Sequence, residues 1–274
     1  MSTVPKPLLG VVAKLSRARD HLKDIDAILE QWTSAVNELG NTIVDSQYQP
    51  DVIELVLPKC PPVDQNLPLI IGDYVHNLRS ALDHLAKQLA VLDKTTNIYR
   101  ELSFPIFATR RGWKDRGISM IKPFVCDKAF EAVKREQPYH ALKFGKDPLK
   151  RILWVLQELD NIDKHRVIVV VSHQMRQHSV SVTLNIGGPT VIVPTPDEGW
   201  RQLEDGAIVA RVNLAGFGPF SPSEVGVKVD GTASLRFADT GLVVDNMTIA
   251  EVMPKLFNET ASIIRRFELE FFPS

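Results

Sequence analysis

The hydrophobic positions of this chain recur at two periods, which separates helical regions from strand-forming regions. From Leu15 to Leu39 apolar residues return every three or four positions, the spacing of an amphipathic helix, and Gly40 follows the expected end. The same spacing predicts long helices over residues 67–91 and 148–165. These segments predict a helical bundle.

Two other parts of the chain alternate between apolar and polar residues. Residues 42–48 and 52–57 flank a Gln-Pro-Asp turn, which predicts a β-hairpin. Beyond residue 165 short alternating segments follow one another, and connections this short favour antiparallel pairing. The strands expected there are 166–172, 180–186, 190–193, 208–214, 225–229 and 234–238.

A helical pattern returns at the C-terminal end. Thr248 and Glu251 have the spacing of a capping box, in which each side chain bonds the other residue's backbone N–H. Apolar residues then recur at helical spacing as far as Phe271. We expect this helix to pack on the helical bundle, because it has no other helices to join.

Together these elements predict an α+β fold. We expect residues 1–165 to form a helical bundle that carries the N-terminal hairpin. Residues 166–246 are expected to form a mostly antiparallel β region, and residues 247–274 the helix that returns to the bundle.

Composition excludes several classes of protein. Hydrophobic residues are 44% and charged residues 24% of the 274, as in folded globular chains. The two cysteines, Cys60 and Cys126, have no neighbours at disulfide-framework, zinc-finger or redox spacing. The longest aliphatic run, Val167–Val171, is far too short to span a bilayer. We therefore expect a cytoplasmic protein with no membrane partner.

The sequence carries no signature of a common enzyme class. It lacks a Gly-rich loop ending in Gly-Lys-Ser/Thr, a Gly-x-Ser-x-Gly elbow and a His-Glu-x-x-His pair, and we expect no cofactor. The formal net charge is −1, yet residues 100–151 contain 13 Lys and Arg against 6 Asp and Glu. Trp113 and Tyr139 in this basic stretch either stack bases or belong to the core.

The helix predicted over residues 67–91 carries an unusual polar band about 120° wide, opposite its apolar face. The band, with Arg79 at its margin, consists of Asp73, His76, Asn77, Ser80, Asp83 and His84. Exposed helix faces normally hold Lys, Glu, Arg and Gln, because Asp, Asn, Ser and His form helices less well. The band is therefore either a polar seam packed against another helix or a catalytic or ligand-binding surface.

The helix predicted over residues 148–165 places two carboxylates, Asp160 and Asp163, on its apolar face. A buried carboxylate costs several kcal/mol unless it is paired and hydrogen-bonded. The obvious donors are Arg79, His76 and His84. We expect Asp163 to lie near Arg79 and His84.

Several blocks of the sequence resemble known proteins. Gly72-Asp73-x-x-His76-Asn77-Leu78-Arg79-Ser80-Ala81-Leu82-Asp83-His84, with Phe104-Pro105-Ile106, Gln137-Pro138-Tyr139 and Leu159-Asp160-Asn161-Ile162-Asp163-Lys164-His165-Arg166, resembles a family of bacterial and phage proteins of unknown function. More distantly, Arg79 and His84, with four residues between them, resemble the Arg-x4-6-His motif of HEPN-superfamily ribonucleases. This second resemblance implies a HEPN-like bundle, a homodimer and metal-independent cleavage of RNA.

In that chemistry His84 would be the acid/base and Arg79 the phosphate clamp. On one helix they are about 7.5 Å apart along the axis and about 140° apart around it, so one helix alone cannot aim both at one phosphate. The resemblance implies that a homodimer, whose cleft combines both motifs, resolves this. In this interpretation Asn77, Ser80 and Asp83 orient His84 or bind substrate, and the further residues expected to support the site are His76, Asp163 and His165.

Two alternatives remain open. His76, His84, Asp163 and His165 are acceptable metal ligands, although the first two are eight residues apart and no His-x3-His pair anchors a site. The chain could instead be a non-catalytic interaction or scaffold protein. Its β region would then bind a partner, and the polar band would only fix helix register.

Overall fold

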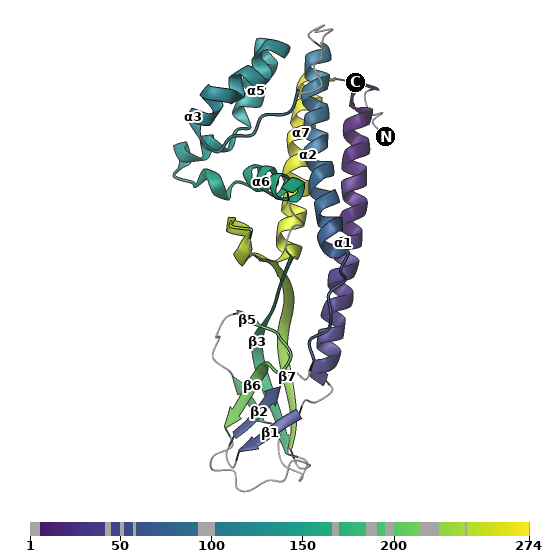
Figure 1. Cartoon of the computed structure of the whole chain (residues 1–274), viewed down its shortest axis with the longest axis vertical. Helices are drawn as coiled ribbons and strands as arrows, with labels where there is room; N and C mark the ends of the chain where they lie inside the picture. Colours follow the sequence, from purple (N-terminus) through teal and green to yellow (C-terminus); the bar gives the residue numbers. More distant parts are fainter. Residues whose placement is uncertain are drawn as a thin grey trace. The chain divides into compact units, whose positions relative to one another are not determined.

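The computed structural model describes the chain as two compact units (Figure 1). The described residues are 6–41, 45–49, 52–56, 59–92, 102–165, 170–184, 191–194, 200–213, 225–238 and 240–273. The first unit is made of residues 1–25, 66–169 and 239–274. The second is made of residues 26–65 and 170–238.

Helices make up the described part of the first unit. The long ones are the first part of α1 (Leu9–Asn41), α2 (Leu67–Leu92), α6 (Ile152–His165) and α7 (Ile249–Phe271). The shorter α-helices are α3 (Arg110–Gly112), α4 (Ile118–Ile121) and α5 (Asp127–Arg135), with a π-helical turn at Trp113–Gly117. 3-10 turns lie at Lys6–Leu8, Lys122–Phe124, Pro138–Phe144, Pro148–Lys150 and Val243–Asn246.

The predicted helical bundle is confirmed, with small shifts of its helix ends. The helix expected over 148–165 begins at Ile152, because Pro148–Lys150 forms a separate turn. The Asp147 side chain caps that turn by accepting from Leu149 N–H at 2.9 Å. The capping box of α7 is formed as predicted, between Thr248 and Glu251.

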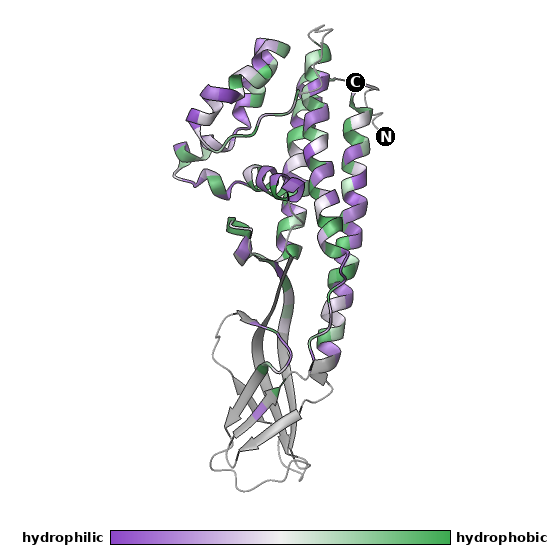
Figure 2. Cartoon of the chain, in the orientation of Figure 1, coloured by the Kyte–Doolittle hydropathy of each residue, from purple (hydrophilic) through white to green (hydrophobic). Residues whose placement is uncertain are grey.

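The core of this unit lies between α2, α6 and α7. Apolar and polar residues alternate along α2 and α7, as the green and purple bands of Figure 2 show. Tyr74 of α2 is fully buried and its hydroxyl donates to the Met253 carbonyl of α7 at 2.6 Å. Phe104 and Phe267 meet edge to face with ring centroids 6.1 Å apart. These contacts hold α7 and residues 102–107 against α2.

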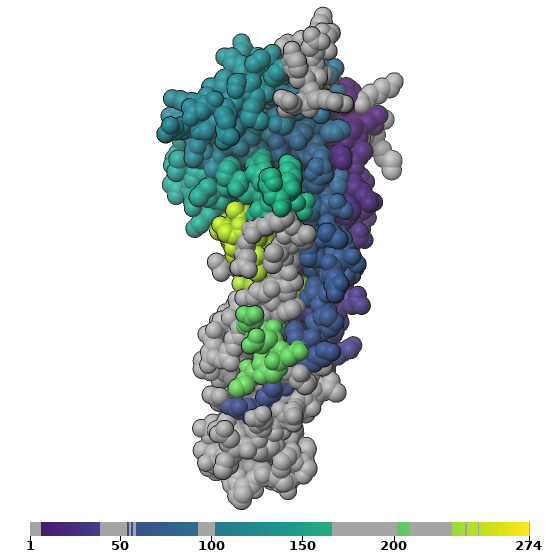
Figure 3. Space-filling model, viewed as in Figure 1, coloured from purple at the N-terminus to yellow at the C-terminus, as the bar shows by residue number. Residues whose placement is uncertain are grey.

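The short helices of residues 110–144 pack around Trp113, which is 3% exposed. Its ring stacks on Phe130 at 5.8 Å and meets Tyr139 at 6.2 Å between centroids. This part of the unit is the teal region of Figure 3, which lies against the blue surface of α2. Of the two roles considered for Trp113 and Tyr139, the structure therefore confirms the core role, since both side chains are buried.

The described part of the second unit contains the strands β1 (Asp45–Gln49), β2 (Val52–Val56), β3 (Val170–Leu184), β4 (Val191–Pro194), β5 (Trp200–Gln202), β6 (Ile208–Asn213) and β7 (Val225–Phe237). One sheet has the order β1-β2-β6, and in the other β3 pairs with β4, β5 and β7. The pairings are antiparallel, and the register of β3 and β7 places Met175 opposite Ala233.

The strands differ from the sequence-based expectation in two ways. The strands expected at 166–172 and 180–186 are one strand, β3, and those expected at 225–229 and 234–238 are one strand, β7. Residues 166–169 and 185–190 lie outside the described residues. The hairpin, which we grouped with the bundle, pairs with β6, since β2 finds its second hydrogen-bonding partner there.

In the part of the chain that the structure describes, no helix combines the length and the apolar character needed to cross a membrane.

Candidate functional site

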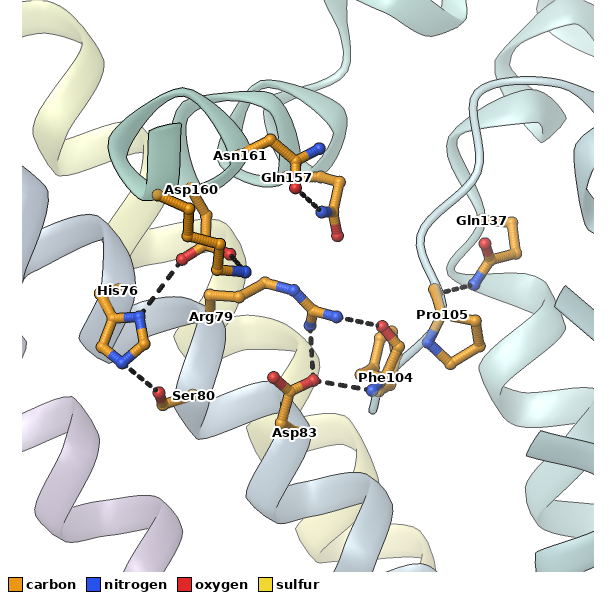
Figure 4. A network of polar contacts seen from close by, with 11 residues as sticks. His76, Arg79, Ser80, Asp83, Phe104, Pro105, Gln137, Gln157, Asp160 and Asn161 are labelled. Carbon is orange, nitrogen blue, oxygen red and sulfur yellow. Dashed lines mark hydrogen bonds and ion pairs between the residues drawn. The ribbon is translucent and has the colours of Figure 1, made fainter. Parts of the chain in front are cut away.

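Arg79 and Asp83 of α2 hold the main chain of residues 102–107. Arg79 is 6% exposed, its Nη2 donates to the Phe104 carbonyl at 2.6 Å, and its Nη1 lies 2.9 Å from Asp83 Oδ1. Asp83 Oδ1 also accepts from Phe104 N–H at 2.8 Å (Figure 4). Two side chains one turn apart therefore bind both backbone polar groups of a single residue.

Burial changes the proton affinity of Asp83. Removal from water raises the pKa of this carboxyl, while the Arg79 charge and the Phe104 N–H lower it. The more distant Asp160 raises the pKa of Asp83 and Lys164 lowers it, so the carboxyls and cations of α2 and α6 act on one another.

Gln137 fixes the other end of the same segment, a role that the sequence analysis did not assign to it. Its side chain is 2% exposed, donates to the carbonyls of Pro105 and Val133, and accepts from Phe107 N–H at 3.0 Å. The Phe-Pro-Ile and Gln-Pro-Tyr blocks are therefore joined by hydrogen bonds (Figure 4). In the sequence, Gln137 stands out only as part of the Gln137-Pro138-Tyr139 block of the family resemblance.

His84 faces α1 instead of the Arg79 side of α2. A methyl group placed on Gly10 of α1 would lie 2.9 Å from His84 Nδ1, so the two helices approach closely beside this imidazole. Burial, then the charges of Lys87 and Lys14, lower the pKa of His84. One chain does not bring Arg79 and His84 together, as the angle between them on the helix predicted.

His76, Ser80 and Asp160 form a chain of polar contacts. His76 Nδ1 lies 3.4 Å from Asp160 Oδ1, and its Nε2 lies 3.3 Å from Ser80 Oγ (Figure 4). A carboxylate only accepts hydrogen bonds, so Nδ1 carries the proton and Nε2 accepts from the Ser80 hydroxyl. Asp160 is fully buried, as its position predicted, and Lys164 pairs with its second oxygen.

Asp160, His76 and Ser80 are the residue types of a catalytic triad, but Ser80 lacks, within its own helix, the backbone donors that such a triad needs beside its serine. Ser80 lies in the middle of α2, where backbone N–H groups are taken up by the helix's own hydrogen bonds. Nearby backbone donors for a tetrahedral oxyanion are therefore not available from the helix. His76 and Ser80 are instead supporting residues beside Asp160.

Asp163 does not lie where we expected it. The structure places it against Gly72, where a methyl group would overlap the Asp163 carboxylate. Gly72 precedes Arg79 by seven residues, about 10 Å along the helix axis. Burial, then Asp160 and Asp73, raise the pKa of Asp163, while the charges of His76 and Lys164 lower it. Expecting Asp163 beside Arg79 and His84 was wrong, because Asp163 packs against Gly72 and the α6 residues beside Arg79 are Gln157, Asn161 and Lys164.

The other candidate residues take separate positions. Asn77 is buried, donates to the Asp73 carbonyl at 2.7 Å and accepts from Lys14 Nζ at 3.3 Å. His165 is exposed at the last residue of α6. Among the described residues no group of three or more metal-ligand side chains gathers, so His76, His84, Asp163 and His165 are not assembled into one site.

A polar cavity of about 410 Å³ opens beside Arg79. Its polar lining residues, supplied by α2, the 102–116 segment and α6, are Arg79, Asp83, Ser103, Arg116, Gln157, Glu158, Asn161 and Lys164. The sequence marked Arg79 and Asp83, but it did not point to Arg116 or Gln157, because only tertiary packing brings them to this cavity. Figure 4 shows Gln157 and Asn161 on the α6 side of Arg79.

Comparison with known proteins adds no family to this description: no protein-family model, no curated protein and no solved structure matches the chain.

Proposed function

We propose that this protein is a HEPN-like endoribonuclease that cleaves RNA without a metal ion, with the scissile phosphate bound in the polar cavity beside Arg79. One observation carries the proposal. Three cations from three segments, Arg79, Arg116 and Lys164, line this cavity together with the amide side chains of Gln157 and Asn161. Guanidinium and ammonium groups with amide donors are the side chains that bind phosphate oxygens.

The chemistry needs one proton acceptor and one proton donor besides the phosphate-binding cations. A base removes the proton of a ribose 2′-hydroxyl, whose oxygen attacks phosphorus, and the bond to the 5′ oxygen breaks. An acid gives that leaving oxygen a proton. The products are a 2′,3′-cyclic phosphate and a 5′-hydroxyl. The cations stabilise the charge that grows on the phosphate oxygens.

Two histidines are available for the proton transfers. His84 has a lowered pKa and is therefore neutral near pH 7, as a base must be, but it faces α1. A site that combines it with Arg79 needs a second copy of the chain, which is why we propose a homodimer. His76 is linked to the cavity through two contacts: it lies beside Asp160, and Asp160 pairs with the cavity residue Lys164.

The test uses purified protein with structured and single-stranded RNA in the presence of a chelator. We expect cleavage that leaves 2′,3′-cyclic ends, is lost in His84→Gln and falls in Arg116→Ala. The matched control is Arg111→Ala, because Arg111 is exposed on the same segment and pairs with Asp115 at 3.4 Å. Loss in His76→Gln and not in His84→Gln would move the acid/base to His76.

Mixing variants tests the two-copy site. Arg79→Ala and His84→Gln each remove one member, so a mixed dimer of the two retains one complete site. We expect the mixture to cleave RNA although neither variant does alone. Absence of cleavage by the folded wild-type protein with every RNA and no added metal would overturn the ribonuclease proposal.

A second function is favoured by one specific contact set. Arg79, Asp83 and Gln137 bind backbone groups of residues 104–107, which is the behaviour of a structural polar seam. In this alternative the chain is a non-catalytic interaction or scaffold protein. If this alternative holds, we expect no RNA cleavage and a marked fall in the free energy of unfolding when Arg79 is replaced.

We also propose that the β region expected over residues 166–246 is mostly antiparallel between residues 170 and 238, the part that belongs to the second unit, in a protein of the cytoplasm. The register of β3 and β7 supports the sheet, and the free thiols of Cys60 and Cys126 support a reducing compartment. A cross-strand nuclear Overhauser effect between Met175 and Ala233 would test the sheet.

A further inference from the structure

A second cavity of the first unit is lined by cations and aromatic rings. Its volume is about 550 Å³, within the range of small-molecule sites. The walls come from residues 110–118 and 134–143, so the basic stretch of the sequence folds around this cavity. None of its lining residues lines the polar cavity beside Arg79.

The fixed charges around this cavity have one sign. Among the described residues that line it there is no carboxylate, and the cations are Arg110, Lys114, Lys134 and Lys143. Lys134 pairs with Glu131 at 2.8 Å. Within the described part of the chain no ion pair engages the other three. Cations that face a concave surface without a counter-charge favour an anionic ligand.

The remaining lining is largely apolar and aromatic. Trp113 and Tyr139 are buried, 3% and 6% exposed, so only a small part of each ring reaches the cavity. The ring of Trp113 is held in place by its stack on Phe130. Ile118 and Leu142 add aliphatic surface, and Leu142 is 63% exposed. A flat ring suits such a lining, because it can pack on the exposed Leu142 side chain and meet the small exposed part of the Trp113 and Tyr139 rings edge to face.

His140 adds a hydrogen-bond acceptor to the wall. Its Nε2 lies 2.9 Å from the Lys134 carbonyl, which only accepts, so Nε2 carries the proton and Nδ1 has a free lone pair. Burial, together with the nearby cations, lowers the pKa of His140 and keeps the ring neutral near pH 7. A neutral imidazole can accept from a base amino group or a ribose hydroxyl.

We propose that this cavity binds a nucleoside phosphate, with the base on the exposed Leu142 side chain beside the small exposed part of Trp113 and Tyr139, and the phosphate beside Arg110, Lys114 and Lys143. A planar ring joined to an anion matches the aromatic lining and the unpaired cations together. The nucleotide comes either from a free mononucleotide or from one residue of an RNA strand. This inference does not rest on RNA cleavage, because it uses a different cavity and different residues.

Isothermal titration calorimetry of the full chain at low salt tests the proposal. The probes are UMP and AMP, their nucleosides uridine and adenosine, inorganic phosphate, and a short single-stranded RNA. We expect saturable binding of at least one mononucleotide with a dissociation constant below about 1 mM, and binding at least about tenfold weaker for its nucleoside and for phosphate alone. Tighter binding of the RNA than of either mononucleotide would assign the site to a strand, and equal or weaker binding to a free nucleotide.

Adjacent arginines supply a matched pair of variants. Arg110→Ala and Lys143→Ala should each weaken nucleotide binding about tenfold. Arg111→Ala, which removes the same charge from an exposed neighbour outside the cavity, should leave binding unchanged. Nucleosides that bind as tightly as nucleotides, no saturable nucleotide binding, or an equal effect of Arg110→Ala and Arg111→Ala would overturn the proposal. The thermal midpoint of each variant checks that it is folded.

Discussion

The burial of Arg79 limits how much of its guanidinium can bind a ligand. An exposed guanidinium remains free for a phosphate, whereas Arg79 is 6% exposed and is already bonded to the Phe104 carbonyl and paired with Asp83. It still lines the polar cavity, so part of its edge reaches the space between α2 and α6. The same side chain therefore fixes residues 102–107 and contributes positive charge to the candidate site.

Replacing Arg79 with alanine should lower the free energy of unfolding by about 2–4 kcal/mol. The Phe104 carbonyl and the Asp83 carboxylate would lose their partner in a buried place. Urea unfolding measures this loss. Arg265→Ala, which removes an exposed arginine paired with Glu268, should cost no more than about 0.5 kcal/mol.

A double variant separates two contributions to the cost of Arg79→Ala: the loss of the ion pair with Asp83 and the loss of the packed side chain. Asp83→Asn removes the charge that Arg79→Ala leaves unpaired, so the two changes together should cost less than the sum of the single changes. A strictly additive cost would contradict the clamp described for Arg79 and Asp83.

His84 should make stability depend on pH just below neutrality. Burial and two lysines lower its pKa in the folded chain, while in the unfolded chain it titrates near 6.5. Between these two pKa values the unfolded chain binds a proton that the folded chain does not. This contribution to stability is therefore present above pH 6.5 and is lost as the pH falls toward the folded pKa.

Urea unfolding at about pH 7.5 and about pH 5.5 checks the sign. The wild type should lose stability between the two, and His84→Gln should lose less. His140, whose pKa is also lowered, contributes with the same sign, so His84→Gln retains part of the dependence. An equal loss in wild type and His84→Gln would show that His84 does not resist protonation.

At the scale of elements, α2 meets a side chain of α6 at a glycine, Gly72. The Asp163 carboxylate occupies the place that a side chain on Gly72 would fill. Alanine normally stabilises a helix interior relative to glycine by about 1 kcal/mol. At Gly72 that gain competes with the displacement of the Asp163 carboxylate.

Gly72→Ala should therefore destabilise the chain by about 1–3 kcal/mol, the usual cost of overpacking. In an Asp163→Ala background the clash is gone, and the same change should stabilise by up to about 1 kcal/mol. Four urea unfolding curves complete this cycle. The same sign of effect in both backgrounds would contradict the close contact between Gly72 and Asp163.

Local patterns explain which elements could be predicted. The ends of α2 and the capping box of α7 follow from neighbouring residues, and both are present as predicted. The pairing of β2 with β6 depends on a strand about 150 residues later, which no local pattern identifies. The turns between residues 110 and 124 are too short to show a period.

For the candidate site, too, part follows from the sequence and part depends on tertiary packing. The polar band of α2 is visible in the sequence, because its residue types are unusual for an exposed helix face. Which neighbour covers each side of the band is a matter of tertiary packing. Residues 102–107 cover the side of Arg79, and α1 approaches His84. The sequence therefore predicted the residues and the angle between Arg79 and His84, but not which segment of the chain covers each of them.

At the scale of the whole molecule, chain order and folding unit do not coincide. The first unit is built from three separate stretches of chain and the second from two. Each has its own internal contacts, so each is expected to open as its own cooperative unit. A change that weakens one unit should then leave the stability of the other almost unaltered.

Hydrogen exchange under increasing urea tests this independence through Thr248→Ala. The substitution removes half of the capping box of α7 and should cost about 1 kcal/mol. Amides of α2, α6 and α7 share the first unit, so their opening free energies should fall together by that amount. Amides of β3 and β7 in the second unit should keep theirs. An equal fall in both groups would mean that the two units unfold as one, because a single global opening gives every core amide the same change in free energy.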